Sequence, residues 1–217
     1  MALVRDEFGP TLPELLGSRL GVRVRTVWLA LAVVGAVAVA IVAWLSLRPD
    51  PSRTQVIIHK PLAFNLLYPH VVHRVPPRSG EVLRLESVRG APQSMAVRVR
   101  HLPAYRGDAS ALFAVMSSRL TDEMRTQYLG FIARGDGRIS INKQPGYQVV
   151  FQARINGRTT YGKRVLLVAS SFPSPREALD ITVLAARSPS VPNADTVGTN
   201  GAMKTPFRSL RFGTDRP

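Results

Sequence analysis

An uncharged run of 22 residues, positions 26–47, constrains this chain more than any other feature. As an α-helix the run would extend roughly 33 Å, close to the bilayer hydrocarbon thickness of about 30 Å. Eleven of its residues are Leu, Ile or Val, and each favours insertion by about 0.3 to 0.6 kcal/mol. Trp28 and Trp44 stand near its two ends, where interfacial indoles are typical. The run therefore predicts a single transmembrane helix.

Two other interpretations of this run are a cleaved signal peptide and a buried helix of a soluble protein. The apolar region of a signal peptide is about 7–15 residues long, and this one is longer. A 25-residue tail precedes it, and Arg48-Pro49-Asp50 follows it in place of a small-residue cleavage site. We therefore expect a membrane anchor at residues 26–47.

The basic residues that flank the run bear on its orientation. Three lie on each side: Arg19, Arg23 and Arg25 before it, and Arg48, Arg53 and Lys60 after it. Because the two counts are equal, the positive-inside rule gives almost no preference for either orientation. Arg23 and Arg25 lie closest to the run, so we expect a cytoplasmic tail and an extracytoplasmic domain in the cell membrane. Arg23, Arg25 and Arg48, with Trp28 and Trp44, form the predicted membrane interface.

The tail and the run each carry a further pattern. In residues 1–25, Thr11 and Glu14 have the spacing of a capping box, which predicts a short amphipathic helix. Within the run, Ala32, Ala36 and Ala40 recur every four residues, and small residues at this spacing permit close approach of two helices. A homodimer through these alanines is a hypothesis, although six alanines in the run produce such a spacing readily by chance.

After a polar linker at residues 48–53, residues 54–217 are long enough for one domain with a sizeable core. This region holds 23 basic and 10 acidic residues, a net charge of +13, and 25 of the 29 basic residues of the chain are arginine. A basic excess indicates an anionic partner, or else a codon bias toward arginine without a ligand. The chain has no cysteine, which excludes disulfides, thiolate metal sites and a cysteine nucleophile.

The pattern of the domain predicts an α+β fold. Apolar residues at helical spacing indicate one principal helix at residues 109–128. Strand-like runs stand at residues 55–59, 63–68, 81–87, 94–102, 131–134, 138–142, 147–155, 158–169 and 179–187. We therefore expect a mainly antiparallel β-sheet with this helix packed on it. Residues 188–205 are interpreted as a long loop, after which Phe207, Leu210 and Phe212 dock onto the core.

Asn156-Gly157 is the strongest local signal in the domain, because this pair suits a type I′ hairpin turn. A two-residue turn fixes the register, so Ile155 should face Arg158 and Gln152 should face Tyr161. One face of the hairpin then belongs to the core. The other face is half-polar and basic, and is either solvated or a surface for an anionic ligand or partner; it carries Gln148, Gln152, Arg154, Tyr161 and Lys163.

The order of these features has a counterpart in a known fold. An early strand ends in Tyr68-Pro69, the central helix follows, Pro145-Gly146-Tyr147 opens a long hairpin, and Phe207 to Gly213 read FRSLRFG. Over residues 63–213 this order resembles the PsbP-like fold, whose relatives include bacterial membrane-attached lipoproteins. The resemblance implies an antiparallel sheet with helices packed on it and a non-enzymatic assembly or binding role. It assigns no site residue.

The sequence shows no catalytic, cofactor or metal-binding constellation. His70 and His73 lack a third ligand on a helix. Gly135-Asp136-Gly137 is interpreted as a turn between two strands and lacks the lysine pattern of a phosphate loop. Nucleic acid is not expected as a partner of an extracytoplasmic domain, although Arg98, Arg100 and His101 share one predicted strand.

We therefore expect a membrane-anchored, non-enzymatic binding or scaffold protein of the cell envelope. Its partner would be another envelope protein, an anionic lipid or a cell-wall polymer. Two alternatives stay open. One is an enzyme of an unrecognised type, and the other is a subunit of a larger membrane complex that acts through the tail and the transmembrane helix.

Overall fold

The fold is described from a computed structural model of the chain. The structure describes residues 24–47, 53–87, 89–103, 109–169 and 176–215. The chain divides into two compact units, Met1–Asp50 and Pro51–Pro217, which are treated separately below.

The first unit contains helix α2, which spans Val24–Leu47. Side chains of α2 are described at residues 28, 30–42 and 44, and all of them are exposed, including Trp28 and Trp44. No helix among the described residues is long and apolar enough to cross a membrane, so the predicted span is not shown. Arg23, Arg48 and the predicted tail helix lie outside the described residues, as does the side chain of Arg25.

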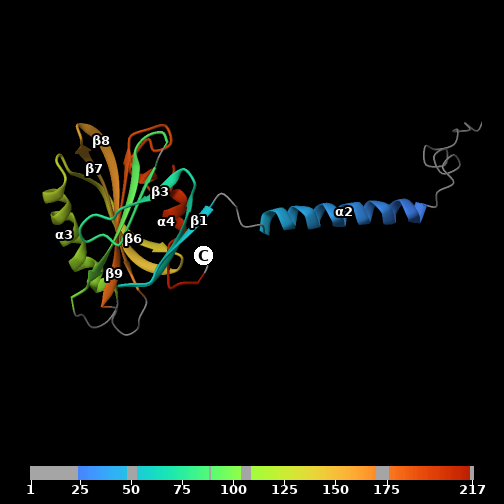
Figure 1. Ribbon diagram of the computed structural model, residues 1–217, viewed down its shortest axis with the longest axis horizontal. Helices are drawn as coiled ribbons and strands as arrows, with labels where there is room; N and C mark the ends of the chain where they lie inside the picture. Colours follow the sequence, from blue (N-terminus) through green and yellow to red (C-terminus); the bar gives the residue numbers. More distant parts are fainter. Residues whose placement is uncertain (1–23, 48–52, 88, 104–108, 170–175, 216–217) are drawn as a thin grey trace, which may run out of the picture. The chain divides into compact units, whose positions relative to one another are not determined.

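The second unit is built on a seven-stranded antiparallel sheet in the order β3-β4-β5-β9-β8-β7-β6. Helix α3, Ala109–Gln127, covers part of one face of this sheet (Figure 1). The strands are β3 Val72–Val75, β4 Leu83–Ser87, β5 Gln93–His101, β6 Ile132–Ile141, β7 Gln144–Ile155, β8 Arg158–Val168 and β9 Glu177–Ala186.

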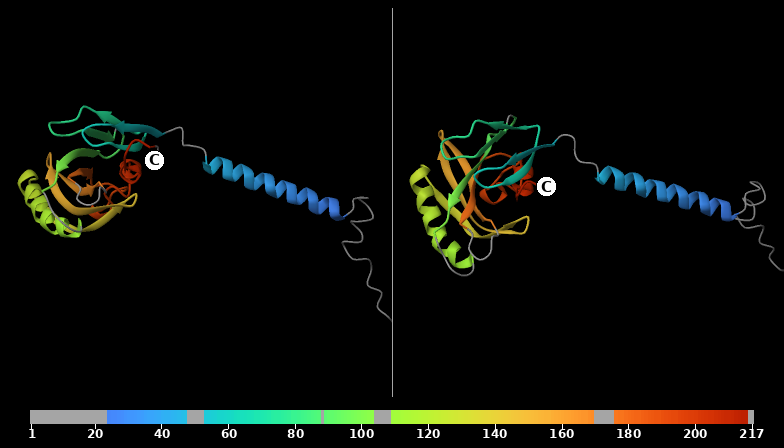
Figure 2. Two further views of the ribbon diagram at one scale, coloured as in Figure 1. Left: turned by 90° about the horizontal axis from the view of Figure 1, so that it is seen from below. Right: turned by 60° about the horizontal axis from the view of Figure 1, so that its bottom comes forward.

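A smaller sheet and a short helix cover the other face of the seven-stranded sheet (Figure 2). The small sheet has the order β1-β2-β10, with β1 Arg53–Ile58, β2 Phe64–Pro69 and β10 Arg211–Phe212. Helix α4, Lys204–Ser209, packs against β2, and the 3₁₀ turn η1, Ala194–Thr196, packs against β7 and β8 of the large sheet. The larger of two buried clusters fills the space between these layers. The α+β class with antiparallel sheets is therefore confirmed.

The second buried cluster lies between α3 and the large sheet. Leu112, Met116 and Leu120 of α3 are almost fully buried, and they pack in one cluster with Phe151 of β7. Gly162 of β8 stands directly opposite Phe151. A Cβ on Gly162 would lie 2.5 Å from Cε1 of the Phe151 ring, so the ring requires glycine at this position.

The predicted β7–β8 hairpin is confirmed. Asn156 and Gly157 both adopt positive φ, at 50° and 75°, as a type I′ turn requires. Ile155 pairs with Arg158 and Gln152 pairs with Tyr161, in the expected register. A second two-residue hairpin, not predicted, joins β6 to β7 through Asn142 and Lys143, whose φ angles are 48° and 66°.

Two predictions about the irregular segments need correction. Gly135-Asp136-Gly137 is not a turn, because β6 runs through it and pairs with β7, with a bulge between Ala133 and Gly135. The two glycines are tolerated there because β6 is an edge strand. Residues 188–205 are also not a plain loop, since they contain η1 and the start of α4. The expected docking of Phe207 and Leu210 is confirmed, because both are buried.

Candidate functional site

The five residues of the predicted ligand surface do not form one exposed face. Tyr161 and Lys163 are buried, with exposed fractions of 9% and 4%. Gln148 and Gln152 are half-buried, and Arg154 is exposed. The physical reason is that η1 contacts both β7 and β8, and apolar residues from Val191 to Leu210 join the cluster on this face. The sequence does not reveal this cover, because the Pro-, Asn-, Gly- and Ser-rich composition of residues 188–205 predicts a loop.

Lys163 has an internal role in place of the predicted external one. Its Nζ donates to the backbone oxygen of Asp195 at 3.4 Å and lies 5.8 Å from the centroid of the Phe207 ring. Burial lowers the pKa of Lys163 from its ordinary value. This lysine therefore contacts the segment that holds η1 and α4 from the sheet and does not face a ligand.

A cleft of about 980 Å³ opens on the opposite face of the sheet, the face that carries α3. Its floor comes from small side chains on neighbouring strands, among them Ala96 of β5 and Thr182 of β9. Thr182 pairs with Arg164, and Arg164 pairs with Val149, a residue packed under α3. Directly paired residues share a face, so the cleft continues the surface that α3 leaves uncovered.

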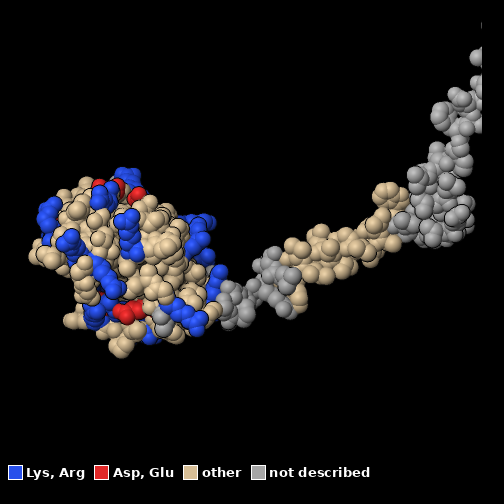
Figure 3. Space-filling model, turned by 90° about the horizontal axis from the view of Figure 1, so that it is seen from above, with Lys and Arg blue, Asp and Glu red and all other residues tan. Residues whose placement is uncertain are grey.

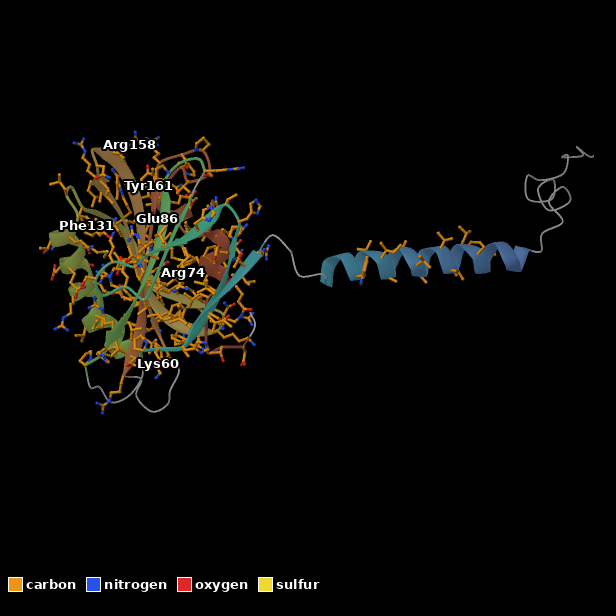
Figure 4. The ribbon with its side chains drawn as sticks, viewed as in Figure 1. Lys60, Arg74, Glu86, Phe131, Arg158 and Tyr161 are labelled. Carbon is orange, nitrogen blue, oxygen red and sulfur yellow. The ribbon has the colours of Figure 1, made fainter. Side chains whose placement is uncertain are left out.

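The walls of the cleft come from three separate parts of the chain. Gln127, Tyr128 and Leu129 at the end of α3 form one part, and the β7–β8 turn forms the second. In this turn Arg158 pairs with Ile155 on the face of the cleft, whereas Arg154 pairs with Thr159 on the other face of the hairpin and lines the cleft at the end of β7. The third is the β4 side, with Glu81 and Glu86. Figure 4 shows Arg158, at the β7–β8 turn, at one end of the domain and Lys60 at the opposite end.

Arginine dominates the charge of the cleft, which is lined by Arg78, Arg84, Arg98, Arg154 and Arg158 against two glutamates. Both glutamates are already paired. Arg84 Nη1 lies 3.2 Å from Glu81 and its Nε donates to Glu86 at 2.8 Å, while Arg98 Nη2 lies 3.6 Å from Glu81.

Within the described part of the chain, Arg78, Arg154 and Arg158 make no salt bridge. Figure 3 shows Lys and Arg side chains spread over one face of the domain, with few acidic residues between them. The cleft therefore has unneutralised positive charge at its rim.

A buried ionic network next to the cleft holds α3 in place. Asp180 of β9, 2% exposed, accepts from Arg164 Nη2 at 2.6 Å and from Arg100 Nε at 3.0 Å. Glu123 of α3 accepts from Arg100 at 2.7 Å and from Arg164 at 2.9 Å. These bonds join α3 to β5, β8 and β9. They therefore fix the position of the helix whose end forms a wall of the cleft.

The network also shifts the ionisation of its members. The hydrogen bond from Arg100 is the main cause that lowers the pKa of Glu123. The same bond raises the pKa of Arg100 above its ordinary value. Burial is the largest single effect on Arg164 and lowers its pKa, but the hydrogen bonds and the charge of Asp180, together with the charge of Glu123, more than offset it and raise the pKa. All three groups are therefore held in their charged forms at neutral pH.

Tyr128 gives the α3 wall its rigidity. Its ring lies 5.1 Å from the Phe151 ring, and Phe131 lies 5.5 Å from the same ring on another side. Burial raises the pKa of the Tyr128 hydroxyl, so this group stays protonated at neutral pH. The cleft thus has a fixed aromatic wall with a neutral polar tip.

One feature of the sequence, the alternation of residues in β5, indicates this cleft. In β5 the polar or small residues Ser94, Ala96, Arg98 and Arg100 alternate with apolar residues. This period of two places Arg98 above the small floor residues, on one face.

Among the described residues, no group of three or more His, Asp or Glu side chains could hold a metal ion.

No protein-family model and no curated protein matches the chain. Its structure is similar to that of LpqN, a protein involved in cell envelope biogenesis of Mycobacterium tuberculosis. The TM-score is 0.50 at 12% identity, over 76% of this chain and 94% of LpqN. The PsbP protein CyanoP from Synechocystis sp. PCC 6803 has a TM-score of 0.48 at 12% identity, over the same shares of the two chains. The resemblance expected from the sequence is therefore present at the level of the fold alone.

Proposed function

We propose that this chain is a membrane-anchored, non-enzymatic binding protein of the cell envelope, and that its domain takes an anionic partner in the arginine-lined cleft. The observation that carries the proposal is the charge of that cleft. Arg78, Arg154 and Arg158 line it without a salt bridge to any described residue, whereas both of its glutamates are paired with arginines. An anionic partner would neutralise this excess of positive charge.

The chemistry of the lining residues favours binding over catalysis. An arginine side chain stays protonated and only donates hydrogen bonds, so it does not exchange protons at neutral pH. Glu81 is almost buried and bonded to arginine, and the raised pKa of Tyr128 keeps its hydroxyl protonated. What these groups do well is hold a carboxylate or a phosphate in a fixed orientation.

The proposed anchor is the uncharged run at residues 26–47, with Trp28 and Trp44 at the two interfaces and the tail in the cytoplasm. Its support is the sequence of the run, together with the helical conformation of α2 over these residues. The domain would then lie outside the cytoplasm. LpqN, which shares the fold only, is involved in cell envelope biogenesis, and this suggests the compartment in which a partner would be sought.

The proposal is tested with the full chain in phosphatidylcholine nanodiscs, titrated with glycerol 3-phosphate, a poly(glycerol phosphate) oligomer and a polyglutamate oligomer. We expect binding to at least one anion, weaker at higher salt because exposed charges are screened. Arg154→Gln/Arg158→Gln should weaken it by about 1.5 to 3 kcal/mol, the value of a hydrogen bond to a charged group. Arg138→Gln/Arg208→Gln removes the same charge from residues that do not line the cleft, and should bind as wild type does.

Two results would contradict the proposal. Absence of binding to all three anions would remove the anion-binding role, and equal losses in the two double variants would remove the cleft as its site. The compartment is tested separately by protease treatment of intact cells. If the domain resists a protease that digests it after the cells are opened, the proposed extracytoplasmic location is wrong.

A further inference from the structure

The rim of the cleft combines positive charge with an exposed apolar side chain. Leu129, just after α3, is 80% exposed and lines the cleft. The backbone N–H of Arg154 donates to the Leu129 oxygen at 2.8 Å, which holds the two residues side by side. Arg158, on the other side of the β7–β8 turn, lines the same cleft. One stretch of rim therefore presents a leucine next to arginines that make no salt bridge to a described residue.

The two sides of the cleft differ in character. Its glutamates, Glu81 and Glu86, both belong to the β4 side. The side formed by the end of α3 and the β7–β8 turn contains no acidic residue, and adds Tyr128 and Ile155 to Leu129. The β4 side is thus nearly balanced in charge. The other side is both cationic and apolar.

A fully water-soluble anion would contact the arginines of this second side but not its apolar residues. It would pair with Arg154 and Arg158 but leave Leu129 in water. A ligand with an anionic group next to a hydrocarbon chain would satisfy the arginines and also cover the leucine. The volume of about 980 Å³ is at the upper end of the range of small-molecule sites, about 300 to 1,000 Å³, and accommodates a headgroup with the start of its chains.

We infer that the cleft binds an amphiphile with a phosphate headgroup, that is, an anionic phospholipid, with the phosphate at Arg154 and Arg158 and the first chain carbons on Leu129. This inference rests on the proposed function, since it specifies the anion that the cleft takes. Phosphate is the assigned anion because the guanidinium fork matches phosphate oxygens in a bidentate manner, and the polyglutamate oligomer tests the carboxylate that the same fork also matches.

The test compares two ligands that share one phosphate chemistry and differ in the hydrocarbon. The full chain in phosphatidylcholine nanodiscs is titrated with dihexanoyl-phosphatidylglycerol and with glycerol 3-phosphate, by calorimetry. We expect the lipid to bind at least about tenfold more tightly than glycerol 3-phosphate, since a buried leucine contributes about 1.5 kcal/mol or more. Leu129→Gln should remove most of this preference without changing the affinity for glycerol 3-phosphate.

Arg154→Gln/Arg158→Gln should weaken both ligands by about tenfold or more, because it removes the groups that hold the shared phosphate. Arg138→Gln/Arg208→Gln is the charge-matched control and should bind both as wild type does. All substituted residues are exposed, and an unchanged far-UV circular dichroism spectrum shows that each variant is folded.

The outcomes separate this inference from the broader proposal. If glycerol 3-phosphate binds as tightly as the lipid, and Leu129→Gln changes neither, the cleft takes a free phosphate and the inference is overturned while the proposed function stands. If only the polyglutamate oligomer binds, the phosphate assignment is wrong. If no anion binds at the cleft arginines, both the inference and the proposed function fail.

Discussion

Neutralising Asp180 should destabilise the domain more than most single substitutions. In Asp180→Asn the buried side chain keeps its size but loses the charge that accepts two hydrogen bonds from Arg164, at 2.8 and 2.6 Å, and one from Arg100 at 3.0 Å. The guanidinium of Arg164, 4% exposed, then keeps Glu123 as its acidic partner. Removal of one partner from a buried ion pair costs about 3 to 5 kcal/mol.

Because Glu123 remains in place, we expect a loss near the lower limit, about 3 kcal/mol in the free energy of unfolding. For a domain of this size that loss corresponds to a fall of about 6 to 12 °C in Tm. Both tryptophans lie in α2, so indole emission reports poorly on the domain. Urea unfolding of the full chain should be followed by far-UV circular dichroism at the β-sheet signal.

Two companion variants make the measurement decisive. Asp122→Asn is the matched control, because its partner Arg125 and Asp122 itself are 67% and 70% exposed, and such pairs contribute about 0 to 1 kcal/mol. Arg164→Met/Asp180→Leu replaces the buried charges with apolar groups and leaves the Arg100–Glu123 bonds intact, so it should recover most of the loss. If Asp180→Asn behaves as Asp122→Asn does, the reasoning about the network is refuted.

Three further predictions concern acid sensitivity, packing and the buried lysine. Arg100 lowers the pKa of Glu123, so this carboxylate stabilises the fold above its unfolded-state pKa of about 4.3. The stabilisation is lost as pH falls through the lower folded-state pKa. In Glu123→Gln the midpoint of urea unfolding should therefore depend less on pH between about pH 6 and pH 3. Gly162→Ala places a Cβ 2.6 Å from Cε2 of Phe151, and thermal unfolding should show a loss of about 1 to 3 kcal/mol from overpacking. Burial lowers the pKa of Lys163, so wild-type stability should rise as pH approaches about 10, whereas Lys163→Met should be at least as stable as wild type at pH 7 and lack that rise.

The sequence was informative where local chemistry alone decides the structure. Asn156-Gly157 permits positive φ at two successive residues, so both the turn and the register of β7 and β8 followed from it. The helical period of residues 112–124 also predicted α3, because its apolar stripe has to be buried. In both cases no distant part of the chain was needed to reach the answer.

The sequence was less informative where distant segments decide the outcome. Tyr161 and Lys163 look like members of a half-polar outer face until a segment some 30 to 50 residues away covers them. Such cover depends on tertiary packing that no local period records. The prediction of a turn at the glycines flanking Asp136 is wrong for a similar reason. A bulged edge strand accommodates both glycines, and the Tyr147 hydroxyl donates a hydrogen bond to Asp136.

The sequence predicts only some of the residues that line the cleft. The pattern of the hairpin indicates Arg154 as a surface residue, but it does not connect Arg154 with Arg84 or Arg158. They come together because β4, β5, β9 and β8 are neighbours in the sheet. A strand order that brings β9 between β5 and β8 cannot be read from the pattern of any one strand. The sequence pattern does not predict that Leu129 lines the cleft, because Leu129 lies one residue beyond the predicted helix.

Strand β10 sets the order in which the domain can be completed during synthesis. It pairs with β2 through Asn65 and Phe64, and Gly213 N–H donates to the Ala63 oxygen at 2.9 Å. A ribosome therefore makes almost the entire domain before one of the first strands receives its last neighbour. A chain interrupted before residue 211 retains an unpaired β2 edge, which is a template for aggregation and a substrate for quality-control proteases.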